Sequence, residues 1–390
     1  MKKNILIFLI LISYTTYSQY IYKDSILLTI SPNIDKEDLF NKEIIKTFNL
    51  FLETKDSSYT SNKYWSKSDF EKYITPYSEL GEIGRGRLGK HFYQPSLMEI
   101  ITTNKENKKI IKVAFIGHNN ETKSNLIKAI YNIVATKIDG KIIFSKYLDY
   151  ATQNWKVLKE SSITYKISAF KTINKQEVIR QKKDISKLCL FFNTKPIEII
   201  YYSCITPKEV FELKGFDYHS MMYIDTSGGF SADKDLVLSG NNSEYYTHEI
   251  VHIYMRHLFP TIIPFFDEGF ATYTGGSGKY NYTWQRDKLK KFLVENPSFK
   301  FEEHVKDPYE RLYFEHETPI PYMIGALVCE RVFRLYGKEK LFELFRSNKD
   351  VFDTLKIVGL TKENINNELL KEIELLPTST IYKNELTIGI

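Results

Sequence analysis

The chain has 390 residues, of which 43% are hydrophobic and 26% charged, and its formal net charge is +6. These values are typical of a soluble globular protein with two or three domains. The basic residues are spread over many segments, and the sequence contains no module that combines aromatic and basic residues as nucleic-acid-binding modules do. We therefore expect no nucleic-acid partner.

The first residues have the pattern of a secretory signal peptide. Two lysines precede the apolar run at residues 5–12, and small residues provide a cleavage point before Gln19. The run is too short to cross a bilayer as a helix, and no later segment is long enough. The alternatives are a buried N-terminal strand or a retained anchor. We predict a signal peptide over residues 1–18 and an exported protein, periplasmic or extracellular, with no transmembrane anchor after signal removal.

Residues 20–160 are predicted to form an N-terminal α+β domain. Helical spacing of apolar residues predicts one helix within Asp35–Glu53 and a short one over Ser68–Ile74. Alternating apolar residues then predict strands from Leu97 to Ile167, with a hairpin turn at Asp139-Gly140. Two helices followed by an antiparallel meander resemble cystatin-like or nuclear-transport-factor-like topology. The resemblance implies a substrate-binding appendage or a pro-segment.

A glycine-rich segment, Gly84–His91, matches the G-x-G-x-x-G pattern and most of a P-loop. A P-loop requires a hydroxyl residue after its lysine to bind magnesium, but His91 stands there. The flanking residues predict neither the buried strand nor the helix that a nucleotide site needs. We interpret the segment as a cationic loop.

Residues 161–390 are predicted to form the second domain. Its first part is expected to alternate between helices and short buried strands, and its part after Gly276 is expected to be mostly helical. The expected elements are helices at Gln176–Phe192 and Pro207–Leu213, strands at Ile197–Cys204 and Leu236–Leu238, and helices at Trp284–Glu295, Pro321–Tyr336, Lys338–Ser347 and Glu363–Leu376.

The residues from His248 to His252 read His-Glu-Ile-Val-His. On a helix, two histidines four residues apart stand on one face and reach the same metal ion. Asn241–Ser243 offers N-cap side chains, and Pro260 ends the helix. In this H-E-x-x-H arrangement the histidines bind zinc and Glu249 acts as general base. The alternative is a buried amphipathic helix with two incidental histidines.

A catalytic zinc ion usually has three protein ligands and one water. Glu268 follows His252 within the segment Pro264–Tyr273, and prolines 260 and 264 bracket a turn that lets a second helix fold back. The pair of segments resembles the gluzincin metallopeptidases, which include thermolysin and the zinc aminopeptidases. In that family H-E-x-x-H on one helix is followed by an N-E-G-x-A-like segment on the next. The resemblance implies that Glu268 is the third zinc ligand; the alternative is a solvated helix glutamate.

The resemblance extends over about Ile163–Asn348 and includes Pro321–Ala326. A P-Y-x-x-G segment at this place in aminopeptidase-like gluzincins supplies a tyrosine that supports the oxyanion of the tetrahedral intermediate. This implies that Tyr322 is the oxyanion donor. The alternative is an ordinary core or surface tyrosine, since the chain has 28 tyrosines, and His316 is a competing donor. The resemblance also implies that the sheet edge before the metal helix, at Leu236–Leu238, holds an extended substrate.

The sequence departs from the family in three respects, one of which is that the interval between His252 and Glu268 is a little shorter than in thermolysin. Nothing between Tyr201 and Asn242 matches the G-x-M-E-N segment that recognises a free N-terminus, so aminopeptidase specificity is not implied. Asp267 stands where the family usually has asparagine, which alters the groups that orient the metal ligands.

The predicted fold class is α+β: an N-terminal α+β domain with an antiparallel meander, then a gluzincin-type unit of a small mixed sheet, active-site helices and a helical subdomain. The predicted function is an exported zinc-dependent peptidase that acts on a peptide or protein substrate. Alternatives are a catalytically silent zinc-stabilised binding protein and a zinc hydrolase of a non-peptide amide or ester. The predicted site consists of zinc ligands His248, His252 and Glu268 with catalytic Glu249 and Tyr322.

Overall fold

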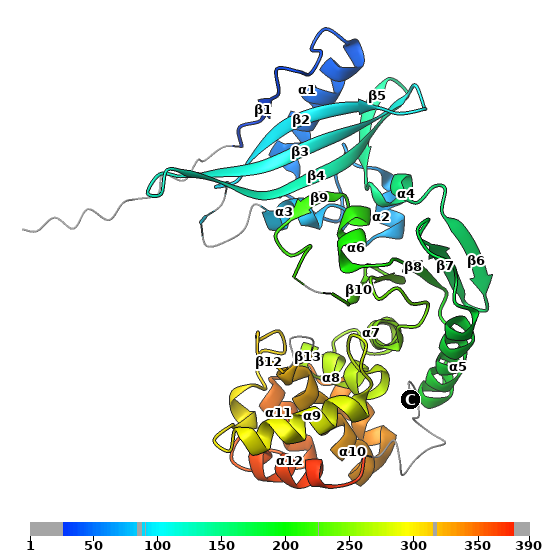
Figure 1. Cartoon of the computed structure of the whole chain (residues 1–390), viewed down its shortest axis with the longest axis vertical. Coiled ribbons are helices and arrows are strands. Elements are labelled where there is room, and N and C mark those ends of the chain that lie inside the picture. Colours follow the sequence, from blue (N-terminus) through cyan, green and yellow to red (C-terminus); the bar gives the residue numbers. More distant parts are fainter. Residues whose placement is uncertain (1–25, 84–87, 90, 225, 315–317, 378–390) are drawn as a thin grey trace, which may run out of the picture.

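The computed structural model describes residues 26–83, 88–89, 91–224, 226–314 and 318–377. The described chain is a mixed α+β protein, as predicted, with two main sheets and a helical part that starts at the metal helix (Figure 1). The predicted signal peptide and most of the Gly84–His91 loop lie outside the described residues. None of the helices in the described ranges has both the length and the apolar character needed to cross a membrane.

The first sheet contains the predicted antiparallel meander, with β1 (Thr29–Ile30) parallel to its first strand. Asp139 and Gly140 in its last turn have φ values of 48° and 73°, as a two-residue hairpin turn of type I′ requires. Three helices share one apolar core with this sheet. The elements are α1 (Leu39–Thr54), α2 (Lys67–Lys72), α3 (Ser78–Ile83), β2 (Gln94–Thr102), β3 (Lys108–Asn119), β4 (Ser124–Ile138) and β5 (Lys141–Ser145).

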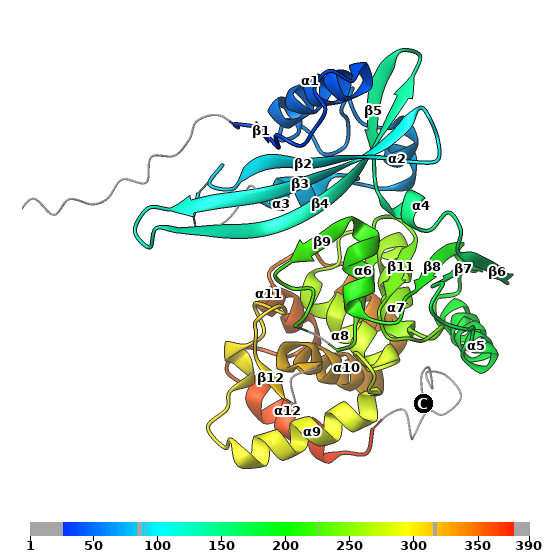
Figure 2. The same cartoon turned by 45° about the horizontal axis from the view of Figure 1, so that its top comes forward.

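A further strand of the first sheet comes from much later in the chain. Strand β9 (Phe216–His219) pairs antiparallel with β4, directly after helix α6 (Pro207–Lys214). Gly215 between them has a φ of 108°, and a Cβ there would lie 2.8 Å from the carbonyl oxygen of Asn132. Figures 1 and 2 show β9 beside β4, and α6 between the first sheet and the second. The short polar sequence of β9 gave no strand signal.

The second sheet has the strand order β10-β11-β8-β7-β6. Its three inner strands are parallel and its two edge strands antiparallel to their neighbours. Helix α5 (Lys175–Phe192) connects β7 to β8, while the short α4 (Leu148–Ala151) precedes the sheet. The strands are β6 (Lys156–Glu160), β7 (Ile163–Ile167), β8 (Ile199–Ser203), β10 (Gly229–Ala232) and β11 (Leu236–Ser239).

The prediction that Leu236–Leu238 forms the sheet edge is wrong. Strand β11 contains these residues, but it lies between β8 and β10. The edge is β10, whose Gly-Phe-Ser-Ala sequence is short and lacks the β-branched alternation that identifies strands.

The rest of the described chain is helical apart from the two-residue strands β12 (Tyr313–Phe314) and β13 (Thr318–Pro319). Gly337, with φ 74° and ψ −176°, interrupts α10 where the sequence predicts two separate helices. The helices bury a second apolar core together with α5 and one face of the second sheet. They are α7 (Thr247–Leu258), α8 (Pro264–Gly275), α9 (Tyr282–Glu295), α10 (Ile320–Phe345), α11 (Val351–Leu355) and α12 (Ile365–Glu374).

Candidate metal centre

Helix α7 carries both candidate ligand histidines on one face. The helix is buried from Thr247 to Met255, and only 4% of His248 and 6% of His252 is exposed. Apolar side chains such as Ile250 and Ile253 belong to the second core. Because of this amphipathic spacing, the apolar residues face the core and the two imidazoles face the other side of the helix.

The prediction that Asn241–Ser243 caps α7 is wrong. The helix begins at Thr247, and the preceding Tyr246 makes no side-chain capping bond. Instead, Gln181 Oε1 of α5 accepts a bond from the Tyr246 backbone N–H (2.8 Å), and Gln181 Nε2 donates to Thr247 Oγ1 (3.0 Å). A contact with a distant helix thus fixes the first turn.

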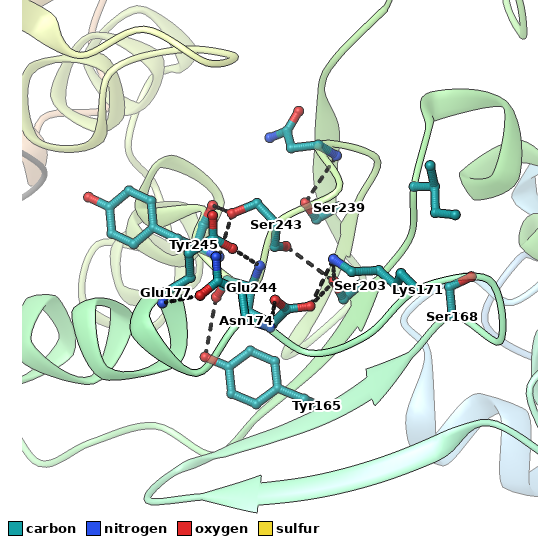
Figure 3. A network of polar contacts seen from close by, with 12 residues as sticks. Tyr165, Ser168, Lys171, Asn174, Glu177, Ser203, Ser239, Ser243, Glu244 and Tyr245 are labelled. Atoms are coloured by element: carbon teal, nitrogen blue, oxygen red, sulfur yellow. Dashed lines mark hydrogen bonds and ion pairs between the residues drawn. The ribbon is translucent and has the colours of Figure 1, made fainter.

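A buried polar network holds the segment just before α7 (Figure 3). Glu244 is 0% exposed, and its Oε1 lies 2.8 Å from both Lys171 Nζ and Ser203 Oγ. Its Oε2 accepts a 2.8 Å bond from the backbone N–H of Asn174. Every oxygen of this buried carboxylate therefore has a donor, as burial of a charge requires. The network ties β8 and the start of α5 to the metal helix.

Helix α8 supplies Glu268, and it begins at Pro264 as predicted. A Cβ on Gly269 of α8 would lie 2.5 Å from the carbonyl carbon of Gly325 in α10. Only glycines allow the two helices to approach this closely. Tyr322 lies one turn before Gly325, so this contact brings it to the cavity that Glu268 lines.

Three ligand atoms converge between α7 and α8. The Nε2 atoms of His248 and His252 are 3.2 Å apart, and Glu268 Oε2 lies 3.4 Å and 3.3 Å from them, respectively. A tetrahedral zinc ion with bonds of about 2.0–2.1 Å places its ligand atoms about 3.3–3.4 Å from one another. The triangle therefore has the dimensions of a zinc site.

The hydrogen bonds of the two Nδ1 atoms orient the rings of His248 and His252. His248 Nδ1 lies 2.6 Å from the Gly276 carbonyl oxygen, and His252 Nδ1 lies 2.8 Å from Asp267 Oδ1. Both partners only accept, so each Nδ1 carries a hydrogen and each Nε2 faces the other ring and Glu268. Burial opposes protonation of His252, but the carboxylates of Asp267 and Glu268 raise its pKa well above its ordinary value. Such partners typically orient zinc-binding histidines.

Glu268 contributes the third atom of the triangle. Its Oε2 is buried and makes no hydrogen bond of good geometry within the described residues. Burial opposes ionisation, yet the imidazoles of His252 and His248 hold the pKa of Glu268 well below its ordinary value. A bound cation would take the place of the protons between these atoms, because neutral imidazoles direct their Nε2 lone pairs at the same point as the Glu268 oxygen. Two histidines and a carboxylate form a donor set typical of catalytic zinc, so the residues fit this metal.

Glu249 has a different partner. Its carboxylate lies within 4.8 Å of the ligand nitrogens of His248 and His252, so distance alone admits it as a ligand. However, Glu249 Oε2 accepts a 2.5 Å bond from the backbone N–H of Ser231 on β10. Arg256 Nη1 in turn donates to Ser231 Oγ at 2.9 Å. These contacts hold Glu249 beside the triangle, where a general base belongs.

Tyr322 packs against the ring of His248. The two rings are stacked, with centroids 6.2 Å apart and planes inclined by 18°. Burial, and after it the Glu268 carboxylate, raises the pKa of Tyr322 far above its ordinary value. The phenol therefore stays protonated and can donate. The competing donor His316 lies outside the described residues.

A cavity of about 660 Å³ joins all five predicted site residues. Its walls also include β10, Arg256 and Tyr309, none of which the sequence indicated. Burial, together with the carboxylates of Glu268 and Asp267, raises the pKa of Tyr309 to about 12. Strand β10, Arg256 and Tyr309 reach the cavity only through the tertiary fold, so no local sequence motif identifies them.

Comparison of the sequence with models of protein families gave no match, and comparison with curated proteins gave no relative. The function of the protein is therefore inferred from the geometry of the site.

Proposed function

We propose that this protein is an exported zinc-dependent peptidase of the gluzincin type. The observation that carries the proposal is the meeting of His248 Nε2, His252 Nε2 and Glu268 Oε2 at 3.2–3.4 Å, the spacing of ligand atoms around a tetrahedral zinc ion. A bound zinc ion would supply Lewis-acid activation of a water molecule and of the scissile carbonyl.

The remaining residues supply the proton transfers and the charge stabilisation. Glu249, oriented by the Ser231 N–H, accepts the proton of the attacking water and passes it to the departing amine. The protonated hydroxyl of Tyr322 donates a hydrogen bond that strengthens as negative charge develops on the carbonyl oxygen. Strand β10 is a sheet edge in the wall of the cavity, so its free edge is placed to hold an extended peptide by main-chain hydrogen bonds.

Replacing the general base tests the proposal. Glu249→Gln removes the proton acceptor but none of the three converging ligand atoms, so we expect zinc content to stay the same while hydrolysis falls by about 10³-fold. Cleavage of a mixture of quenched peptides, with and without a chelator, measures activity, and elemental analysis measures zinc. Glu295→Gln on the exposed side of α9 is the control. Undiminished cleavage by Glu249→Gln would contradict the mechanism, and a zinc-loaded wild type that cleaves nothing would favour a silent binding protein.

Replacing the candidate oxyanion donor tests its separate role. Tyr322→Phe keeps the ring stacked on His248 but removes the hydroxyl. Loss of one such donor lowers kcat by about 10²–10³-fold. We expect KM and zinc content to change little, since the hydroxyl acts on charge that forms only during the reaction. A variant with unchanged kcat would assign the oxyanion to another group.

A further inference from the structure

The edge strand of the cleft is held in place from outside the second sheet. Strand β10 lines the cavity, and its Ser231 N–H is the donor to Glu249. Within the second sheet its partner is β11, to which it is joined by a tight turn. The position of this hairpin therefore decides where the general base of the proposed peptidase points.

The turn of the β10–β11 hairpin is bound by the N-terminal part of the chain. Asp233 Oδ1 accepts hydrogen bonds from the backbone N–H groups of Ile74 (3.0 Å) and Thr75 (3.5 Å), just after α2. Lys234 Nζ donates to the carbonyl oxygen of Glu71 at 2.9 Å. These contacts join residues about 160 positions apart in the chain. Asp233 and Lys234, which are consecutive in the turn, therefore both form hydrogen bonds with the segment at residues 71–75.

Other contacts tie the same hairpin to α3, to the residue after α2 and to α4. Lys214 Nζ lies 4.4 Å above the ring of Phe230 in β10, and it also lies 3.6 Å from Glu79 on α3. Tyr73 and Leu148 from the first part of the chain share a buried apolar cluster with Leu236 and Leu238 of β11. Polar and apolar contacts therefore agree in fixing the hairpin against the N-terminal domain.

We infer that the N-terminal domain positions the cleft, with Asp233 as the positioning residue. Its carboxylate, bound to the backbone at residues 74–75, holds the turn, and the turn holds Ser231 within reach of Glu249. The consequence for catalysis rests on the proposed peptidase function. The contact between the N-terminal domain and the hairpin does not depend on that function, and amide exchange measures it directly.

The backbone conformation of Asp233 allows a clean set of variants. Its φ of 57° is in the left-handed region, which asparagine and glycine adopt readily. Asp233→Asn keeps an acceptor oxygen, and Asp233→Gly keeps the conformation but removes the acceptor. Asp139 is the matched control, because it has a φ of 48° in the hairpin turn between β4 and β5, away from the cavity.

Hydrogen–deuterium exchange of the zinc-loaded full chain tests the link. Losing the two bonds should accelerate exchange at Ser231 and Ile74 roughly tenfold in Asp233→Gly, while Asp233→Asn stays near the wild type. Asp139→Gly measures the effect of a glycine alone on a hairpin turn. We expect it to accelerate amide exchange near residue 139 by less than about threefold. An Asp233→Gly effect no larger than this control would overturn the inference.

Activity provides the second readout. If the wild type cleaves peptides, Asp233→Gly should lower kcat/KM roughly tenfold at unchanged zinc content, and Asp233→Asn should restore it. Full activity of Asp233→Gly together with faster exchange would overturn the positioning of Glu249 by the turn. If the wild type cleaves nothing, the proposed function fails, but the exchange result still decides whether the N-terminal domain holds the hairpin.

Discussion

Glu244, in the segment before α7, and Glu268, in α8, are both buried carboxylates, but they have different neighbours. Glu244 lies among donors: a lysine ammonium, a serine hydroxyl and a backbone N–H all point at it. Glu268 Oε2 instead lies 3.4 Å and 3.3 Å from two histidine nitrogens that can also bind a metal ion. Burial alone is therefore a poor guide to function. The identity of the neighbouring atoms separates a carboxylate in a structural ion pair from the one that we propose as a zinc ligand.

The largest expected effect is on stability at Glu244. Glu244→Gln leaves the Lys171 ammonium, whose side chain is 7% exposed, without its counter-charge. Breaking a buried ion pair on one side costs about 3–5 kcal/mol. We expect the free energy of unfolding to fall by this amount in denaturant titrations, with or without zinc. Glu160→Gln, which breaks the exposed pair with Lys182, is the control, with an expected cost below about 1 kcal/mol. Equal costs would show that the Glu244 network contributes no more than a surface pair.

At Glu268 the effect on zinc binding should be the larger one. Glu268→Gln removes a carboxylate whose pKa the imidazoles of His252 and His248 hold well below its ordinary value, so the zinc-free protein should also lose some stability near neutral pH. Zinc affinity should fall at least about 100-fold, because a charged ligand is lost. Competition with a chromophoric chelator measures this. Glu249→Gln is the matched comparison, since its carboxylate is also within 4.8 Å of the histidine nitrogens. If Glu249→Gln loses zinc and Glu268→Gln keeps it, the two roles must be exchanged.

The part of the site that local spacing encodes could be predicted from the sequence. His248 and His252 come to one face because they are four residues apart on a helix. Pro264 begins the second helix, so Glu268 lies one turn into it. The meander and its Asp139-Gly140 turn were also predictable, because strand alternation and turn residues act over short distances.

The supporting contacts could not be predicted, because they join residues far apart in sequence. Lys171 and Glu244 meet only after β8 and α5 have packed against α7. Strand β10 becomes the sheet edge because β8 occupies the other side of β11, a matter of strand order that no local pattern contains. Sequence motifs thus located the proposed ligand atoms, while the groups that fix their positions emerged only from the fold.

The smallest expected effect concerns the group that orients one ligand. Asp267 Oδ1 accepts from His252 Nδ1, and Asp267→Asn keeps an acceptor while removing the negative charge. Such changes weaken metal binding about 10–100-fold, and we expect the lower end because the hydrogen bond can remain. Asp235→Asn is the control: Asp235 binds His257, a half-exposed histidine at the end of the same helix, and should leave zinc affinity unchanged. An unchanged affinity in Asp267→Asn would mean that the hydrogen bond alone orients His252. In that case the asparagine usual in the gluzincins and the aspartate of this chain serve the metal equally well.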